Sequence, residues 1–167
     1  GFTSLIYLYF IKKLNNNGQK YDFSNSIIIH GGGWKKLEKL NISNKKFCYL
    51  LKKKIGAQNI INYYGLVEQT GSIFFECNKC RNFITSNFSE VVIRDKDFNA
   101  QKKNKKGLIQ LFSIIPTSYA GHILLTEDEG EIRSHRKCKK CQKKNGTRFR
   151  IYGRTQMAEV RGCSDTI

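Results

Sequence analysis

The chain has 167 residues and a net charge of +17, from 30 Lys and Arg against 13 Asp and Glu. Its hydrophobic content of 40% and aromatic content of 12% exclude a disordered or collagen-like chain, and its length fits one domain or part of one. The longest apolar run covers only residues 5–11, whereas a membrane-spanning helix needs about 20 residues. We therefore expect no membrane span, and because no secretory signal pattern is present, we expect a cytoplasmic protein.

The positive charge has two interpretations. A basic surface can bind nucleic acid, but an AT-rich genome would also produce this composition, since Lys, Asn and Ile are abundant together. The lysines lie largely in predicted loops, such as residues 102–106, rather than along one element. We favour a solvated surface that attracts nucleotide phosphates, and we do not expect nucleic-acid binding.

The first 70 residues alternate between helical and strand patterns. Apolar side chains at helical spacing predict a helix over residues 2–14, and a β-branched run at 26–29 predicts a buried strand that ends in a glycine-rich turn. A helix over 44–54 and a second buried strand over 59–63 follow. This order favours an α/β fold class with a parallel layer over residues 1–70.

After residue 70 the pattern changes to short strands. They are predicted at residues 71–76, 90–94, 107–114, 121–126 and 147–152, with turns between them. We expect an antiparallel β subdomain over residues 71–153, followed by a hinge and C-terminal arm over 154–167.

Four of the six cysteines form two C-x-x-C pairs, Cys77 with Cys80 and Cys138 with Cys141. Together they supply the four thiolates of a tetrahedral structural Zn²⁺ site, and neighbouring lysines offset the surplus negative charge. Residues 81–137 separate the pairs, more than the spacing of about 15–20 usual in zinc ribbons, so the intervening strands must bring them together. The alternative is a set of unrelated buried or redox thiols.

Four segments carry groups suited to a nucleotide. Gly32 and Gly33 would permit close approach of the backbone to a flat ligand. Tyr64 could stack on a base, and Glu68 could hold a hard cation. Asp128, in a predicted acidic turn over 126–131, could bind ribose hydroxyls, and Arg154 could bind phosphate. The plain alternatives are an ordinary glycine turn and a solvated acidic turn.

The order of these motifs resembles the adenylate-forming superfamily of acyl-activating enzymes. Residues 29–37, 64–72, 116–122, 125–128 and 158–166 are similar to one branch, the acyl-protein synthetase family, which is the fatty-acid–protein ligase of bacterial luminescence fatty acid reductase systems. The resemblance covers residues 25–167 and implies the C-terminal part of an adenylate-forming fold, truncated at its N-terminus. Relatives such as phenylacetate–CoA ligases carry a similar cysteine-based zinc site.

The resemblance implies an acid–thiol ligase that uses ATP and Mg²⁺ to convert a carboxylic acid, here a fatty acid, into an acyl adenylate and then a thioester. It also implies an acyl reductase as partner protein. The superfamily has Thr or Ser before the glutamate, where this chain has Val67, with Thr70 as a candidate substitute. Carried over by residue, the roles are adenine contact for Gly32, Gly33 and Tyr64, Mg²⁺ binding for Glu68, ribose binding for Asp128, and ribose or phosphate contact for Arg154.

The family holds the activated acid as a thioester on one of its own cysteines. With four cysteines assigned to zinc, Cys48 and Cys163 remain. Cys48 lies in a predicted helix, where burial would leave it inert. Cys163 follows Arg161 and Gly162, which favour a thiolate on a movable arm, so we predict Cys163 as the acyl acceptor. The alternative is a half-buried thiol without a role.

Two other functions remain open from the sequence. One is a ligase of the same superfamily that delivers the acyl group to coenzyme A, which analysis of the thioester product would reveal. The other is a non-enzymatic basic zinc-ribbon module that binds nucleic acid, which predicts tight binding with a steep salt dependence. Aromatic residues do not alternate with the lysine clusters as a base-stacking platform requires, which argues against the second.

Overall fold

The computed structural model describes residues 1–16, 21–34, 40, 42–117, 120–135, 141–142 and 145–155. The chain divides into two compact units, of which the first is built on Gly1–Tyr63 and the second on Tyr64–Glu159. Within the described residues, no helix combines the length and the apolar character needed to cross a membrane.

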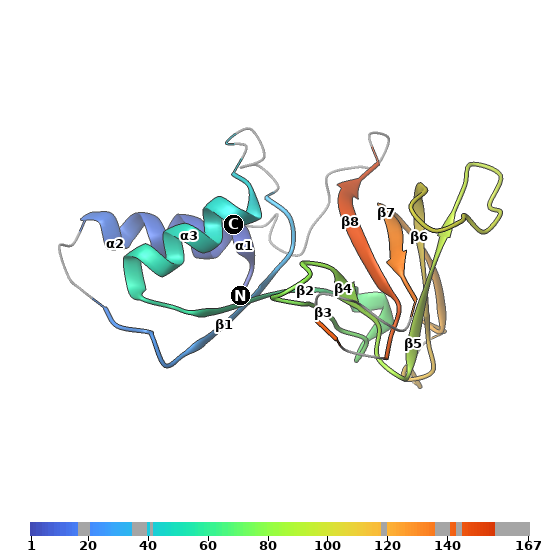
Figure 1. Cartoon of the computed structure of the whole chain (residues 1–167), viewed down its shortest axis with the longest axis horizontal. Coiled ribbons are helices and arrows are strands. Elements are labelled where there is room, and N and C mark those ends of the chain that lie inside the picture. The colour runs from blue at the N-terminus through green and yellow to red at the C-terminus, as the bar shows by residue number, and fades with distance from the viewer. Residues whose placement is uncertain are drawn as a thin grey trace. The chain divides into compact units, whose positions relative to one another are not determined.

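The first unit contains a small parallel α/β layer (Figure 1). Its N-terminal helical segment comprises α1 (Thr3–Leu5), the π-helical turn η1 (Ile6–Ile11) and α2 (Lys12–Asn16). Strand β1 (Ile27–Gly31) leads through α3 (Asn44–Ile55) to β2 (Asn59–Tyr64), and the two strands pair in parallel. The alternation of helix and strand expected from the sequence is confirmed.

Helix α3 begins and ends at capping residues. The Ser43 hydroxyl accepts a hydrogen bond from the Lys46 backbone N–H at 3.2 Å, and Gly56 ends the helix with a φ of 71°. The apolar side of the helix is fully buried and forms, with residues of η1 and β2, the core of the first unit. This core comprises Ile11, Ile42, Phe47, Leu51, Ile55, Ala57 and Ile60.

The second unit contains six antiparallel strands in the order β3-β4-β8-β7-β6-β5. Alternate side chains of these strands enclose one apolar core, as the pattern of short strands predicts. The strands are β3 (Phe74–Glu76), β4 (Phe83–Ile84), β5 (Ser89–Arg94), β6 (Lys106–Ser113), β7 (Ile123–Ser134) and β8 (Arg148–Arg154). The core comprises Phe74, Val91, Ile93, Ile109, Leu111, Ile132 and Phe149.

Strand β7 corrects one sequence prediction. Residues 126–131, predicted as an acidic turn, lie inside β7, where residues 129–131 pair with both β6 and β8 and Asp128 pairs with β8. Register shifts between Glu129 and Gly130 and between Ile132 and Ser134 break the alternation of polar and apolar residues by which a strand is recognised. The carboxylates are tolerated because Lys106 pairs with Glu129 and Arg133 pairs with Glu131 at 2.9 Å.

Candidate functional site

The glycine-rich turn lies at the end of β1 in the first unit. A Cβ on Gly31 would lie 2.7 Å from the Tyr63 ring, so the close contact between β1 and β2 requires glycine. The preceding His30 is 2% exposed, and its Nδ1 lies 2.9 Å from the Thr3 hydroxyl. Its own chain neighbours aside, no described atom lies within 4 Å of the position that a Cβ on Gly33 would occupy. A buried histidine thus anchors the start of the turn.

Tyr64 and Asp128, both predicted as nucleotide-binding residues, meet in the second unit. The Tyr64 hydroxyl donates a hydrogen bond to Asp128 Oδ2 at 2.6 Å. Burial raises the pKa of Tyr64, and the nearby Asp128 carboxylate raises it further, so the hydroxyl remains a donor at neutral pH. The Asp128 backbone N–H donates to the Thr126 hydroxyl at 3.1 Å. The carboxylate is therefore held in place from both its side chain and its backbone.

The Tyr64 ring is half-buried beside three phenylalanines. Its centroid lies 6.2 Å from the rings of Phe74 and Phe83 and 6.4 Å from that of Phe149. These contacts join the ring to the core of the second unit, which fixes its plane. Stacking on adenine stays a prediction, and the bond to Asp128 gives the same side chain a second role that the sequence did not reveal.

Glu68 lies on a single 3-10 turn, η3 (Val67–Gln69), and its side chain is exposed. Among the described residues, its carboxylate makes no hydrogen bond or ion pair, so its oxygens are open to a cation. The turn itself is anchored, because the buried Gln69 donates through Nε2 to the Gly121 carbonyl at 2.9 Å. The Thr70 hydroxyl donates to the Val67 carbonyl at 2.9 Å and thus caps the turn in this structure.

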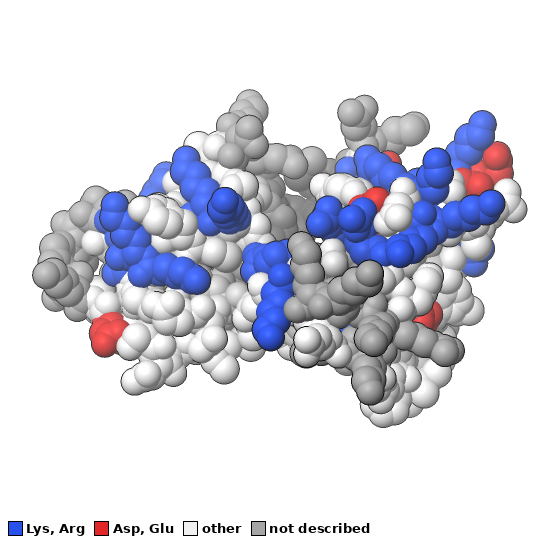
Figure 2. Space-filling view, viewed as in Figure 1, with Lys and Arg blue, Asp and Glu red and all other residues white. Residues whose placement is uncertain are grey.

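Arg154 closes β8 directly opposite Asp128 in the register of β7 and β8. Its Nη1 lies 3.9 Å from Glu127 Oε2, and both side chains are largely exposed. A surface pair at this distance contributes little to stability. On the face that Figure 2 shows, the Lys and Arg side chains of the second unit have a few acidic side chains among them.

Three of the four predicted zinc ligands converge. The sulfur atoms of Cys77, Cys80 and Cys141 all lie within 4.8 Å of one another, a group that could hold a metal ion. Cys138 lies outside the described residues. In both C-x-x-C pairs the residue after the second cysteine has a positive φ, 56° at Arg81 and 57° at Gln142. Arg81 and Gln142 thus share a left-handed backbone conformation directly after the second cysteine of each pair.

Hydrogen bonds prepare the first of these turns for a cation. The Cys77 backbone N–H donates to the Asn82 carbonyl at 2.9 Å, and the Arg81 N–H donates to the Cys77 carbonyl at 2.8 Å. Burial raises the pKa of the Cys77 thiol, but backbone N–H groups of Cys80 and Lys79 and the neighbouring thiols outweigh burial, so the pKa lies below its usual value. Such a thiol readily becomes the thiolate that a metal needs.

The two cysteines outside the zinc set differ in what the structure describes. Cys48 lies in α3, as predicted, and is half-buried, with its Sγ 3.3 Å from Asn44 Oδ1. Cys163, the predicted acyl acceptor, lies outside the described residues.

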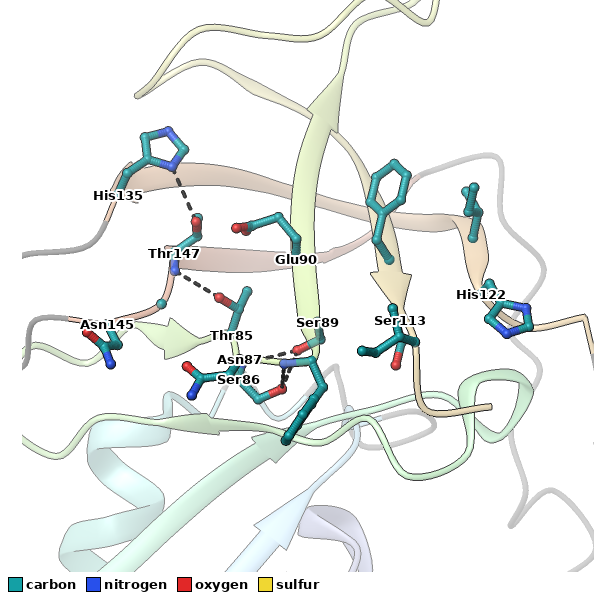
Figure 3. A pocket seen from close by; sticks show the side chains of 15 residues that line it. Thr85, Ser86, Asn87, Ser89, Glu90, Ser113, His122, His135, Asn145 and Thr147 are labelled. Carbon is teal, nitrogen blue, oxygen red and sulfur yellow. Dashed lines mark hydrogen bonds between the residues drawn. The ribbon is translucent and has the colours of Figure 1, made fainter. Parts of the chain in front are cut away.

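A cleft of about 1030 Å³ that sequence reasoning missed opens in the second unit (Figure 3). Its wall includes Thr147, directly before β8, whose N–H donates to Thr85 Oγ1 at 2.8 Å and whose hydroxyl lies 3.2 Å from His135 Nδ1. These residues come from three separate segments and share no local motif, so no pattern in the sequence could have marked the cleft.

The whole sequence, residues 1–167, matches the protein family described as Acyl-protein synthetase, LuxE. The chain belongs to the acyl-protein synthetase family. The resemblance inferred from its motifs is therefore confirmed. None of the curated proteins with which the chain was compared matches it.

Solved structures of adenylate-forming enzymes share the fold of this acyl-protein synthetase chain. A long-chain-fatty-acid-CoA ligase from Archaeoglobus fulgidus matches 92% of the chain and 33% of its own length, with 11% identity and a TM-score of 0.57. McyG A-PCP in complex with phenylalanyl-adenylate matches 92% of the chain and 29% of its own length, with 17% identity and a TM-score of 0.52. MatB from Rhodopseudomonas palustris matches 89% and 29%, with 12% identity and a TM-score of 0.57. The chain thus spans about a third of the length of these structures.

Proposed function

We propose that this chain is part of an acid–thiol ligase that activates a carboxylic acid with ATP. A carboxylate oxygen of the acid attacks the α-phosphorus of ATP, and the bond to pyrophosphate breaks to leave an acyl adenylate. A thiolate then attacks the acyl carbonyl carbon and AMP leaves, which produces a thioester. Membership of the acyl-protein synthetase family supports this reaction class, and the resemblance to fatty-acid–protein ligases of luminescence systems supports a fatty acid as substrate.

The observation that carries the proposal is the bond between Tyr64 and Asp128. It joins residues from two motifs of the family, 64 positions apart, and presents a fixed carboxylate of the kind that binds ribose hydroxyls. Arg154 lies opposite in register and supplies a cation for the ribose or phosphate. The family resemblance assigns contact with adenine to Gly32 and Gly33.

Glu68 fits a magnesium ligand because its carboxylate is exposed and makes no bond among the described residues. Mg²⁺ bound there would offset the negative charge of the phosphates. The hydrogen bond from Gln69 to Gly121 holds the turn, so Glu68 is presented from a fixed backbone rather than from a loose loop.

Exchange of labelled pyrophosphate into ATP tests the reaction class. The full-length protein, supplied with fatty acids of different lengths, is expected to catalyse exchange that depends on the acid. Exchange that never depends on a carboxylic acid would refute acyl activation by this protein.

We further propose that the acyl group passes to Cys163 and then to an acyl reductase. The full-length protein is loaded with labelled fatty acid and ATP and then treated with neutral hydroxylamine, which cleaves thioesters. Cys163→Ala is expected to abolish the hydroxylamine-labile label, while Cys48→Ala retains it. Wild-type labelling of Cys163→Ala would place the acceptor elsewhere, and rapid formation of acyl-CoA would favour the coenzyme A ligase instead.

We propose a structural zinc ion at the cysteine cluster, with Cys138 as the fourth ligand. Cys77, Cys80 and Cys141 fit this ion because their sulfurs all lie within 4.8 Å of one another. Metal analysis of protein purified without chelator is expected to find one equivalent of zinc. A content far below one equivalent would refute the site.

A further inference from the structure

A fully buried arginine lies beside the cysteine cluster. Arg148, the first residue of β8, is 0% exposed and is the largest completely buried side chain of the chain's described part. Burial of a guanidinium is costly unless hydrogen bonds and opposite charge offset the loss of hydration. Arginine is seldom found in such a place without a charged group nearby that requires it.

The contacts of Arg148 identify the cysteine cluster as that charged group. Its Nη2 lies 3.9 Å from the Sγ of Cys141, within the range of a hydrogen bond to sulfur. Its Nη1 donates to the Gly146 carbonyl at 2.9 Å. The planar guanidinium therefore holds a sulfur of the cluster with one nitrogen and the backbone that enters β8 with another.

A metal-loaded cysteine cluster carries a negative charge that the positive guanidinium can stabilise. Three thiolates around a divalent ion leave a net negative charge, and a fourth thiolate increases it. Because this charge is partly buried, its energy depends strongly on a cation nearby. A guanidinium is always protonated, so it supplies that charge at every physiological pH.

We propose that Arg148 is the buried counter-charge of a metal–thiolate cluster and that it couples the metal to the wall of the adjacent cleft. The inference rests on the zinc site proposed above and makes Arg148 a positioning residue rather than a ligand. The Gly146 carbonyl that it holds precedes Thr147, whose backbone exchanges hydrogen bonds with Thr85 at 2.8 and 3.0 Å. Gly146, Thr147 and Thr85 all line the cleft of Figure 3.

The test measures zinc affinity by competition with a chromogenic chelator. Arg148→Met is expected to weaken zinc binding by about 10- to 100-fold, the usual effect of losing a residue that supports a metal ligand. Arg148→Lys, which keeps the charge, is expected to lose much less. The matched control is Arg150→Met, since Arg150 lies on the same strand but is exposed and bonds to Asn82. Equal zinc affinity of the Arg148→Met and Arg150→Met variants would overturn the proposal.

A second variant, Cys80→His, separates the effect of the charge of Arg148 from the effect of its packing. Cys80→His removes one negative charge from the cluster, so the loss of affinity caused by Arg148→Met is expected to shrink there. An equally large loss of zinc affinity in the Cys80→His protein would show that Arg148 acts by packing. It would overturn the proposal that Arg148 is a counter-charge.

Cobalt spectra provide a readout that does not depend on Arg148→Met being folded. In Co²⁺-loaded Arg148→Lys protein, the sulfur-to-cobalt charge-transfer band is expected to shift relative to wild type, because the hydrogen bond to Cys141 changes. An unchanged band would contradict that bond. Wild-type protein that binds neither Zn²⁺ nor Co²⁺ would instead refute the metal site itself, so the two failures are distinguishable.

Discussion

The cysteine cluster and the Tyr64–Asp128 pair, both in the second unit, are organised in different ways. At the cysteine cluster, turns, backbone hydrogen bonds and the buried Arg148 direct three sulfurs to one point. Among the residues assigned to the nucleotide, Tyr64 holds the Asp128 carboxylate, whereas the side chains of Glu68 and Arg154 are exposed. The first arrangement suits an ion that stays bound, and the second suits a ligand that enters and leaves in each catalytic cycle.

The largest expected effect is at the cysteine cluster. Cys80→Ala, which removes a buried ligand, is expected to abolish tight zinc binding and to lower the free energy of unfolding by several kcal/mol, since metal binding is folding energy at such a site. Cys48→Ala, in α3, should change it by about 1 kcal/mol or less. Denaturant unfolding of zinc-loaded protein measures both, and equal stability of the two variants would show that the cluster is not a metal site.

Glu68, unlike the cysteines of the cluster, is expected to contribute to catalysis but not to the stability of the fold. Glu68→Gln is expected to slow acid-dependent pyrophosphate exchange by about 10²- to 10³-fold, because it removes a charge that would hold the metal on the phosphates. Unfolding should be unchanged, since Glu68 has no partner among the described residues. Glu90→Gln, another exposed glutamate of the second unit, is the control. Exchange within threefold of wild type would remove Glu68 from the mechanism.

A substitution at Tyr64 can distinguish stacking of its ring on adenine from positioning of Asp128 by its hydroxyl. Tyr64→Phe keeps the ring but removes the hydroxyl that holds Asp128, and it is expected to weaken ATP binding by about 10-fold, the effect of losing one hydrogen bond to a charged group. Asp128→Asn should weaken binding as well, and the double variant should lose less than the sum of the two. Calorimetric titration measures these affinities, and wild-type affinity of Tyr64→Phe would leave the hydroxyl without a role in binding.

The pH dependence of the same bond follows from the pKa of Tyr64. Because burial and the Asp128 carboxylate raise that pKa, the contribution of the bond to stability is fully present below the usual tyrosine value of about 10 and is lost only as the pH rises through the raised value. The difference in unfolding free energy between wild type and Tyr64→Phe should thus be constant from about pH 6 to 9. A decline across that range would mean that the tyrosine ionises early.

The smallest expected effect concerns the second cysteine turn. Gln142 has a φ of 57°, a conformation that costs a residue with a side chain about 1–2 kcal/mol and glycine almost nothing. Gln142→Gly should stabilise the zinc-loaded protein by about 0.5–1 kcal/mol, after the greater flexibility of glycine in the unfolded chain is subtracted. Gln142→Ala, which keeps the strain, should have no such effect, and equal stability of the two variants would contradict the strained turn.

The sequence predicts the parts of this molecule that depend on neighbouring residues. Helix α3 is marked by Ser43 and Gly56, and the converging cysteines by their own spacing. The sequence does not reveal the strand over 126–131, because bulges disrupt its alternation of polar and apolar residues. It does not reveal β4 either, because a strand of two residues is too short to show an alternation. The bond between Tyr64 and Asp128 spans 64 positions, so only the folded sheet reveals it.

Binding of a non-hydrolysable acyl-adenylate analogue to the full-length protein tests the central claim most directly. Calorimetry is expected to show tight binding of the analogue by wild type, and binding weakened by about 10-fold or more in Asp128→Asn, because that carboxylate would hold the ribose. Failure of the wild-type protein to bind the analogue, or equal binding by both proteins, would contradict a nucleotide site built on Asp128.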